Sequence, residues 1–380
     1  MSGFDYNCPT KIVFGPGCLD DLGELAAGLG VTRVMVVSDP GIEEVGHTQR
    51  GVASLKEAGL EPHIFDGLAE NPTTKHVDAG VLVAKEFEPQ AIIAIGGGSS
   101  MDCAKGVNFL YSCGGSMQDY WGVGKATGDL LPMIAVPTTA GTGSEAQSFA
   151  LISDAETHVK MACGDKRAAF RIAILDPELT VTQPDRVTAL TGIDAISHAV
   201  ETFVTKKQNE RSLRYSLQAW RLLTSGFQQV LYDADDLTAR TAMQHGACSA
   251  GMAIENSMLG AAHALANPVT AKYDVTHGEA IGIVLPWVVR HNSSDERVAI
   301  AYNKLLSETG DTSDESTDQL ADYLSQLVEY ANLATTLSSC GVERESLPQL
   351  AVEAAKQWTG TFNPVEMSTN DYLNLYEQAF

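Results

Sequence analysis

Residues 91–105 read AIIAIGGGSSMDCAK, and this stretch decides the fold class of the N-terminal half. An apolar segment at 91–95 runs directly into three glycines and then into the start of a helical pattern. Backbone amides and the positive end of a helix dipole converge there, so a phosphate can approach without obstruction by side chains. A tight turn with positive φ would also select glycine, but three glycines directly after a buried strand favour a ligand.

The sequence around this stretch repeats an alternation of short apolar strands with helices. We expect further strands at 10–15, 33–38, 63–65, 131–136 and 172–175, and helices at 18–29 and 77–87. Continuously apolar strands joined by helices predict a doubly wound parallel sheet. A second loop of small residues and hydroxyls, 137–145, follows one of these strands, and two such loops fit a dinucleotide crevice. Residues 149–153 and 158–161 are typical of a hairpin.

The pattern changes after residue 183. Strand signals largely vanish from Pro184 onward, and long helical patterns replace them at 212–223, 236–253 and 317–340. We therefore expect two domains, an α/β domain at 1–183 and an all-helical domain at 184–380.

Four residues of the helical half have the chemistry of metal ligands. Asp194 and His198 stand four apart in an apolar helical pattern, so both project from one face. His263 lies in a run of small apolar residues, and His277 follows Asp274, which we interpret as the N-cap of the next helix. Three imidazoles and one carboxylate suit Fe²⁺ or Zn²⁺ and suit Mg²⁺ or Ca²⁺ poorly. On spacing alone, separate core or capping histidines remain an open alternative.

Composition narrows the class of protein. The 380 residues carry 25 Lys and Arg against 48 Asp and Glu, a formal net charge of -23, which opposes binding to nucleic acid or acidic membranes. Seven cysteines form no C-x-x-C motif, which fits a reducing compartment. The N-terminus has no basic and apolar signal, and no apolar run approaches a membrane span. We expect a cytoplasmic protein.

Taken in order, these motifs resemble the iron-containing (group III) alcohol dehydrogenases. The similarity runs essentially end to end. It comprises KIVFG at 11–15, GGGS at 96–99 with Asp102 and Lys105, PTTAGTGSE at 137–145, and the four candidate metal ligands in order.

The resemblance implies a Rossmann-like domain at 1–183 and an all-helical metal-binding domain at 184–380, a dehydroquinate synthase-like fold. It implies that Asp194, His198, His263 and His277 bind Fe²⁺, Zn²⁺ or another divalent first-row metal and are catalytic. It also implies hydride transfer between NAD(H) and a small primary alcohol or its aldehyde, and a homodimer or larger homo-oligomer. The family's cofactor contacts carry over to Asp39, Asn71, Gly97, Gly98, Ser99, Asp102, Thr138, Thr139, Thr142, Phe149 and Lys160.

We expect NAD(H) to be preferred over NADP(H) because of Asp39. This carboxylate closes the second strand, where it could accept hydrogen bonds from the adenosine ribose of NAD. The extra phosphate of NADP would meet a like charge, and no basic residue follows at 40–44. The alternative is that Asp39 only caps the following helix.

The sequence departs from the family at two positions. Many relatives carry a histidine four residues after the third ligand, where this chain has Asn267, which cannot exchange a proton near neutral pH. The family's Asn-Pro-Arg is Asn363-Pro364-Val365 here. Phe149, Ile254 and Phe362 resemble substrate-pocket positions and suggest short primary alcohols.

Other activities stay open. Glycerol dehydrogenase-like enzymes and others that oxidise polyols or hydroxy acids, maleylacetate reductases and dehydroquinate synthases share this fold, and the full Asp and three-His set favours the alcohol dehydrogenases. A metal-binding protein without turnover is the alternative of a different class.

Overall fold

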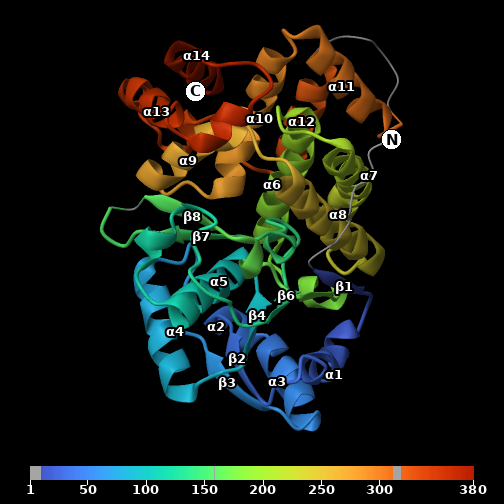
Figure 1. The fold of residues 1–380 in the computed structure, drawn as a ribbon. Coiled ribbons are helices and arrows are strands. Elements are labelled where there is room, and N and C mark those ends of the chain that lie inside the picture. The colour runs from blue at the N-terminus through green and yellow to red at the C-terminus, as the bar shows by residue number, and fades with distance from the viewer. Residues whose placement is uncertain (1–9, 158, 311–317) are drawn as a thin grey trace, which may run out of the picture. The chain divides into compact units, whose positions relative to one another are not determined.

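The computed structural model describes residues 10–157, 159–310 and 318–380, and the chain divides into two compact units (Figure 1). The first unit contains the described residues up to Thr139 together with Ser144–Thr182. The second contains Gln183–Phe380 and also the short segment Ala140–Gly143. The prediction divided the chain once, into 1–183 and 184–380. It did not assign Ala140–Gly143 to the second unit.

A parallel sheet forms the centre of the first unit. Within the described residues it has six strands in the order β1-β9-β6-β4-β2-β3, and every neighbouring pair is parallel. The strands are β1 (Lys11–Phe14), β2 (Arg33–Val37), β3 (Glu61–Phe65), β4 (Ala91–Gly96), β6 (Met133–Pro137) and β9 (Ile172–Leu175). All residues of β4 and β6 are buried, as their continuous apolar runs predict. The predicted parallel α/β sheet is confirmed.

Helices follow the strands of the first unit. They are η1 (Cys18–Asp21), α1 (Leu22–Ala27), α2 (Pro40–Glu44), α3 (His47–Glu57), α4 (Thr74–Phe87), α5 (Gly98–Cys113), η2 (Met117–Tyr120), η3 (Ser144–Ala146), η4 (Lys166–Ala168) and η5 (Pro177–Thr180). One face of the sheet packs against α1 and α3, where Leu22 and Leu55 join the cluster that includes Val36, Ile93 and Ile134. The chain runs from β2 outward to β3 and then back to β4 on the other side of β2, so the strand order reverses between β2 and β4.

A small second sheet completes this unit. Its strands are β5 (Gly122–Val123), β8 (Lys160–Gly164) and β7 (Phe149–Ser153), in that order. The expected hairpin is present, since β7 and β8 pair antiparallel with Phe149 opposite Gly164. Its second strand, β8, begins at Lys160, and His158, where this strand was expected to begin, lies outside the described residues.

The described residues of the second unit form helices joined by loops, with no strand among them. Its helices are α6 (Asp185–Val204), α7 (Glu210–Tyr232), α8 (Leu237–Asn256), α9 (Ala261–Tyr273), α10 (His277–Asn292), α11 (Glu296–Ser307), α12 (Gln319–Tyr330), η6 (Ser338–Cys340), η7 (Arg344–Ser346), α13 (Leu347–Ala354), η8 (Trp358–Phe362) and α14 (Thr369–Ala379). One hydrophobic core unites them, with α6 and α10 contributing many of its residues.

The helix predicted at 317–340 is shorter than expected. The pattern at 317–340 suggested a single helix, but α12 ends at Tyr330, and Thr317 lies outside the described residues. Asn332 has a φ of 52°, a left-handed conformation that an α-helix cannot continue through. Among the described residues, no helix combines the length and the apolar character needed to cross a membrane.

Candidate metal centre and nucleotide-binding loops

Helix α6 presents two of the candidate ligands from one face. Asp194 and His198 are separated by one helical turn, and both side chains are buried. The Nε2 atom of His198 lies 3.4 Å from Oδ1 of Asp194. The predicted pairing across one turn is therefore present.

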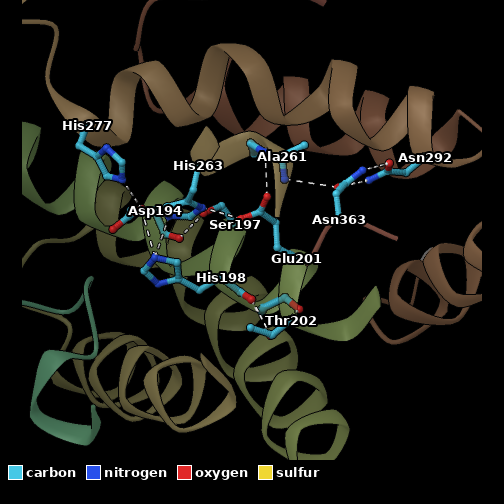
Figure 2. Close-up of polar contacts among 12 residues, drawn as sticks. Asp194, Ser197, His198, Glu201, Thr202, Ala261, His263, His277, Asn292 and Asn363 are labelled. Carbon is cyan, nitrogen blue, oxygen red and sulfur yellow. Dashed lines mark hydrogen bonds and ion pairs between the residues drawn. The ribbon is translucent and has the colours of Figure 1, made fainter. Parts of the chain in front are cut away.

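The other two histidines come from different helices and meet the same carboxylate. His263 is the third residue of α9 and His277 the first residue of α10. Their Nε2 atoms lie 3.5 Å and 3.7 Å from Asp194 Oδ1, and the Nε2 atoms of His198 and His263 are 3.2 Å apart (Figure 2). The expected N-cap at Asp274 is wrong. Asp274 ends α9 with a φ of 53°, and Thr276 occupies the N-cap of α10.

The four side chains fit a divalent first-row metal. Ligand atoms about 2.1 Å from a tetrahedral ion stand about 3.4 Å apart, close to the separations found here. The ligand atoms of Asp194, His263 and His277 all lie within 4.8 Å of one another. Buried Oδ1 of Asp194 has no conventional hydrogen-bond donor among the described residues, only the imidazole nitrogens around it. Such a carboxylate with nitrogen donors is suited to a cation such as Fe²⁺ or Zn²⁺.

Electrostatics in the cluster favour a bound cation. Burial opposes the charge on Asp194, but His198, His263 and His277 outweigh it and hold the pKa of this carboxyl well below its usual range. Burial lowers the pKa of His198. Burial acts in the same direction on His263, yet the carboxylates of Glu201 and Asp194 raise its pKa to about 9. Two buried carboxylates therefore face His263, and this environment favours a positive charge at the centre.

Glu201 was not among the residues expected at this centre. Its Oε2 lies 2.5 Å from Nδ1 of His263, and its Oε1 accepts a hydrogen bond of 2.8 Å from the backbone N–H of Ala262. Glu201 follows His198 by three residues and Asp194 by seven, spacings that place all three on one side of a helix. That spacing is the signal that could have identified it.

The loops after β2 and β4 form a surface suited to a nucleotide. They adjoin where the strand order reverses, the position at which doubly wound sheets bind ligands. Gly96 has a φ of 152°, and a Cβ there would lie 2.2 Å from Ser100 Oγ, so only glycine fits. Gly97 occupies the N-cap of α5, and Gly98 begins the helix, so no Cβ projects from these two positions. A phosphate could approach these amides directly.

Asp39, directly after β2, caps the short helix α2. Its Oδ1 accepts hydrogen bonds from the backbone N–H groups of Gly41 and Ile42, at 3.1 Å and 3.2 Å. Its Oδ2 accepts a longer one, 3.4 Å, from the hydroxyl of Ser100. The alternative that Asp39 caps a helix is thus observed. The side chain is only half-buried, and its contact with a cofactor ribose stays a prediction.

Several other predicted cofactor residues lie close to one another in the first unit. The backbone N–H of Asn71 donates to Ser99 Oγ at 3.2 Å, and Lys160 Nζ donates to Asn71 Oδ1 at 3.5 Å. Thr138 follows β6 and is buried, and its hydroxyl has no partner among the described residues. The γ atoms of the next residue, Thr139, lie 3.4 Å from the position that a Cβ on Gly97 would take. This arrangement leaves hydroxyls and an ammonium around the glycine loop.

The remaining predicted cofactor residues lie elsewhere. Asp102 is buried and its Oδ1 accepts a hydrogen bond from the Ser144 hydroxyl at 2.8 Å. Lys105 Nζ donates to the carbonyls of Ser144 and Phe149, both at 2.8 Å. These contacts hold the start of β7, and direct cofactor contacts of Asp102 and Phe149 stay predictions. Thr142 is exposed and belongs to the second unit.

Comparison with known proteins identifies relatives along the whole chain. Residues 9–177 match the family model described as "Iron-containing alcohol dehydrogenase", and residues 188–380 match "Fe-containing alcohol dehydrogenase family, C-terminal". The chain is 33% identical to the 1,3-propanediol dehydrogenase of Klebsiella pneumoniae, with 99% of each protein covered. It is 32% identical to the NAD-dependent methanol dehydrogenase of Bacillus methanolicus, again with 99% of each covered. A crystal structure of 1,3-propanediol oxidoreductase superposes with a TM-score of 0.95 at 31% identity and covers 100% of both chains.

Proposed function

Because the chain belongs to the iron-containing alcohol dehydrogenase family, we propose that it is a metal-dependent, NAD(H)-linked alcohol dehydrogenase or aldehyde reductase acting on small primary alcohols. The observation that carries this proposal is the convergence of three imidazole nitrogens on the buried Oδ1 of Asp194. The reaction converts an alcohol and NAD⁺ into the aldehyde, NADH and a proton.

Asp194, His198, His263 and His277 would hold the metal. A divalent ion bound there supplies Lewis acidity toward the oxygen of the alcohol or aldehyde. The single carboxylate among these ligands leaves such an ion with a net positive charge. Asp194 and His198 are buried, which keeps bulk water away from these ligands. The positive charge of the ion is then less screened and polarises the substrate oxygen more strongly. Fe²⁺ is the ion we propose, with Zn²⁺ as the alternative.

The nucleotide would use the loops after β2 and β4. Its pyrophosphate suits the first turn of α5, and its adenosine ribose suits Asp39. Two like charges about 4 Å apart cost on the order of 4 kcal/mol at an effective dielectric of 20, and solvent screening reduces this at a half-exposed group such as Asp39. The repulsion is the reason to propose NAD(H) over NADP(H).

The proton released in the reaction needs a route that does not use Asn267. The Nδ2 of Asn267 donates to Oε1 of Gln357 at 3.2 Å, and neither amide titrates near neutral pH. We propose that the proton leaves through cofactor ribose hydroxyls and water.

Small alcohols are the proposed substrates. The names of two relatives give 1,3-propanediol and methanol as their substrates, both small molecules. In this chain, the apolar side chains of Ile254 and Phe362 occupy positions that resemble substrate-pocket positions. A related oxidoreductase activity on glycerol or another polyol is the alternative.

A substrate screen tests the proposal. The absorbance of NADH is followed with aldehydes from acetaldehyde to hexanal and with glycerol-derived carbonyl compounds, with added Fe²⁺ or with a chelator. Oxidation that depends on the metal is expected with the short aldehydes. No oxidation under any condition would favour a metal-binding protein without turnover.

We also propose that the enzyme is a homodimer or larger homo-oligomer in the cytoplasm. The odd number of cysteines and the lack of a C-x-x-C motif support a reducing compartment. Light scattering coupled to size-exclusion chromatography measures the oligomeric state.

A further inference from the structure

We propose that Glu201 is a positioning residue of the metal centre, which orients His263 for the metal, and that Asn363 holds the helix end on which this orientation depends. The inference rests on the proposed function, because it concerns the same metal. It is carried by a chain of polar contacts leading away from the ligands (Figure 2).

The first step is the contact between Glu201 and the imidazole. Oε2 of Glu201 lies 2.5 Å from Nδ1 of His263, and an ionised carboxylate can only accept a hydrogen bond. The proton of the neutral ring therefore resides on Nδ1, and the lone pair of Nε2 points toward Asp194 and His198. By contrast, Nδ1 of His198 has no hydrogen-bond partner among the described residues. Glu201 thus selects the tautomer of His263 that can bind a metal.

The second step is the N-terminus of α9, the helix that carries His263. The N-cap residue, Gly260, has no side chain with which to cap the helix. Instead, the N–H of Ala262 donates to Glu201 Oε1 at 2.8 Å, and the N–H of Ala261 donates to Asn363 Oδ1 at 3.3 Å. A Cβ on Gly260 would lie 3.0 Å and 3.2 Å from these two oxygens, so glycine leaves room for them. The negative charge of Glu201 also suits the positive end of the helix dipole.

The third step links Asn363 to the other ligand-bearing helices. Asn363 Nδ2 donates to Asn292 Oδ1 at 2.7 Å, and Asn292 Nδ2 returns a hydrogen bond of 3.0 Å to Asn363 Oδ1. Asn292 is the last residue of α10, which begins with His277. The carbonyl of Phe362, next to Asn363, accepts hydrogen bonds from the Thr205 hydroxyl and the Lys206 N–H, directly after α6. Residues 362–363 therefore connect α9 and α10 to the chain that follows α6.

This network also explains which part of the Asn363-Pro364-Val365 motif matters. Asn363 Nδ2 also donates a hydrogen bond of 2.8 Å to the carbonyl oxygen of Val365. A backbone carbonyl makes this contact, so the side chain at position 365 is free to differ from the arginine of relatives. The loss of that arginine leaves the support of His263 intact.

The test is the metal affinity of Glu201→Gln. Glutamine is nearly isosteric, but one side of its amide is a donor, so it cannot accept from both His263 Nδ1 and the Ala262 N–H. We expect the affinity of the metal-free protein for Co²⁺, titrated by its visible absorption, to fall roughly 10- to 100-fold. Glu279→Gln is the matched control. Glu279 is also buried in the second unit, but it bonds to Arg186 and to the N–H of Ala334. It should retain wild-type Co²⁺ affinity.

Glu201→Asp separates charge from size. It keeps the acceptor charge on a shorter side chain, so we expect a loss of Co²⁺ affinity of about threefold to tenfold, smaller than that of Glu201→Gln. Thermal melting of each metal-free variant shows whether it folds. If Glu201→Gln does not fold, the comparison of Glu201→Asp with Glu279→Gln tests the inference. Unchanged Co²⁺ affinity in Glu201→Asp then overturns it.

The remaining outcomes separate this inference from the proposed function. Wild-type affinity in a folded Glu201→Gln overturns the inference alone, and so does a larger loss in Glu201→Asp than in Glu201→Gln. A wild-type protein that binds no Co²⁺ overturns both the inference and the metal dependence.

Discussion

The nucleotide-binding loops and the metal centre differ in the chemical groups that line them. Around the glycines that follow β4, the surface consists of backbone amides and small side chains that leave access for a ligand. The metal centre consists of a carboxylate and imidazole side chains from three helices, α6, α9 and α10, all buried except the half-buried His277. The comparison teaches that the nucleotide loops depend mainly on the course of the backbone, whereas the metal centre depends on the orientation of individual side chains.

The largest effect is expected from removing one ligand of the metal centre. His263→Ala should lower kcat/KM at least about a thousandfold, because Lewis-acid stabilisation contributes several kcal/mol to the transition state. Steady-state kinetics measure this loss. The binding of NADH, followed by fluorescence, should stay near the wild-type value, because its proposed contacts after β2 and β4 belong to the other unit. Full activity in this variant would show that the histidine cluster is not the catalytic metal centre.

The next largest effect concerns Ala140–Gly143. This segment is part of the small-residue loop 137–145 and belongs to the second unit. A Cβ on Gly251 of α8 would lie 2.3 Å from the carbonyl oxygen of Gly143. This oxygen belongs to the backbone, so it cannot turn aside as the end of a flexible side chain can. Gly251→Ala should lower the free energy of unfolding by about 1–3 kcal/mol, as overpacking does. Urea denaturation measures the change.

Gly128→Ala is the control for this substitution. The nearest atom to a Cβ there is Cys113 Sγ, at 3.8 Å, an ordinary contact. We expect its stability to remain near that of the wild type. Equal stability of the two variants would mean that the Gly143–Gly251 contact relaxes freely and does not hold the loop.

The smallest effect is expected at the half-buried Asp39, beside the nucleotide loops. Asp39→Gly should raise kcat/KM for NADPH at least about tenfold and change the value for NADH modestly, because it removes a like charge from the proposed position of the extra phosphate. Glycine in place of an N-cap aspartate costs only a few tenths of a kcal/mol, so the loss of the α2 cap should not mask the result. Comparable efficiencies of the wild type with NADH and NADPH would contradict the assignment.

Local sequence patterns were sufficient where the structure depends on neighbours in the chain. The continuous apolar run of β4, followed by glycines, predicted a buried parallel strand and an open helix N-terminus, and both are present. Asp194 and His198 were predicted to share a helix face because a helix repeats every 3.6 residues. Local patterns were less reliable at element ends. Asp274 caps the end of a helix although it was expected to begin one, because aspartate suits an N-cap and also tolerates the left-handed backbone at a helix end.

The sequence by itself determined the strands, the glycine loops and the residue types that suit a metal. Only the tertiary structure brought His263 and His277 to Asp194, and only it revealed the contacts of Glu201 with His263 and of Asn363 with α9. The physical reason is the range of the interactions. Backbone periodicity acts over a few residues and leaves a repeat in the sequence, whereas side chains far apart in the chain meet only after the helices pack, and that packing leaves no local repeat.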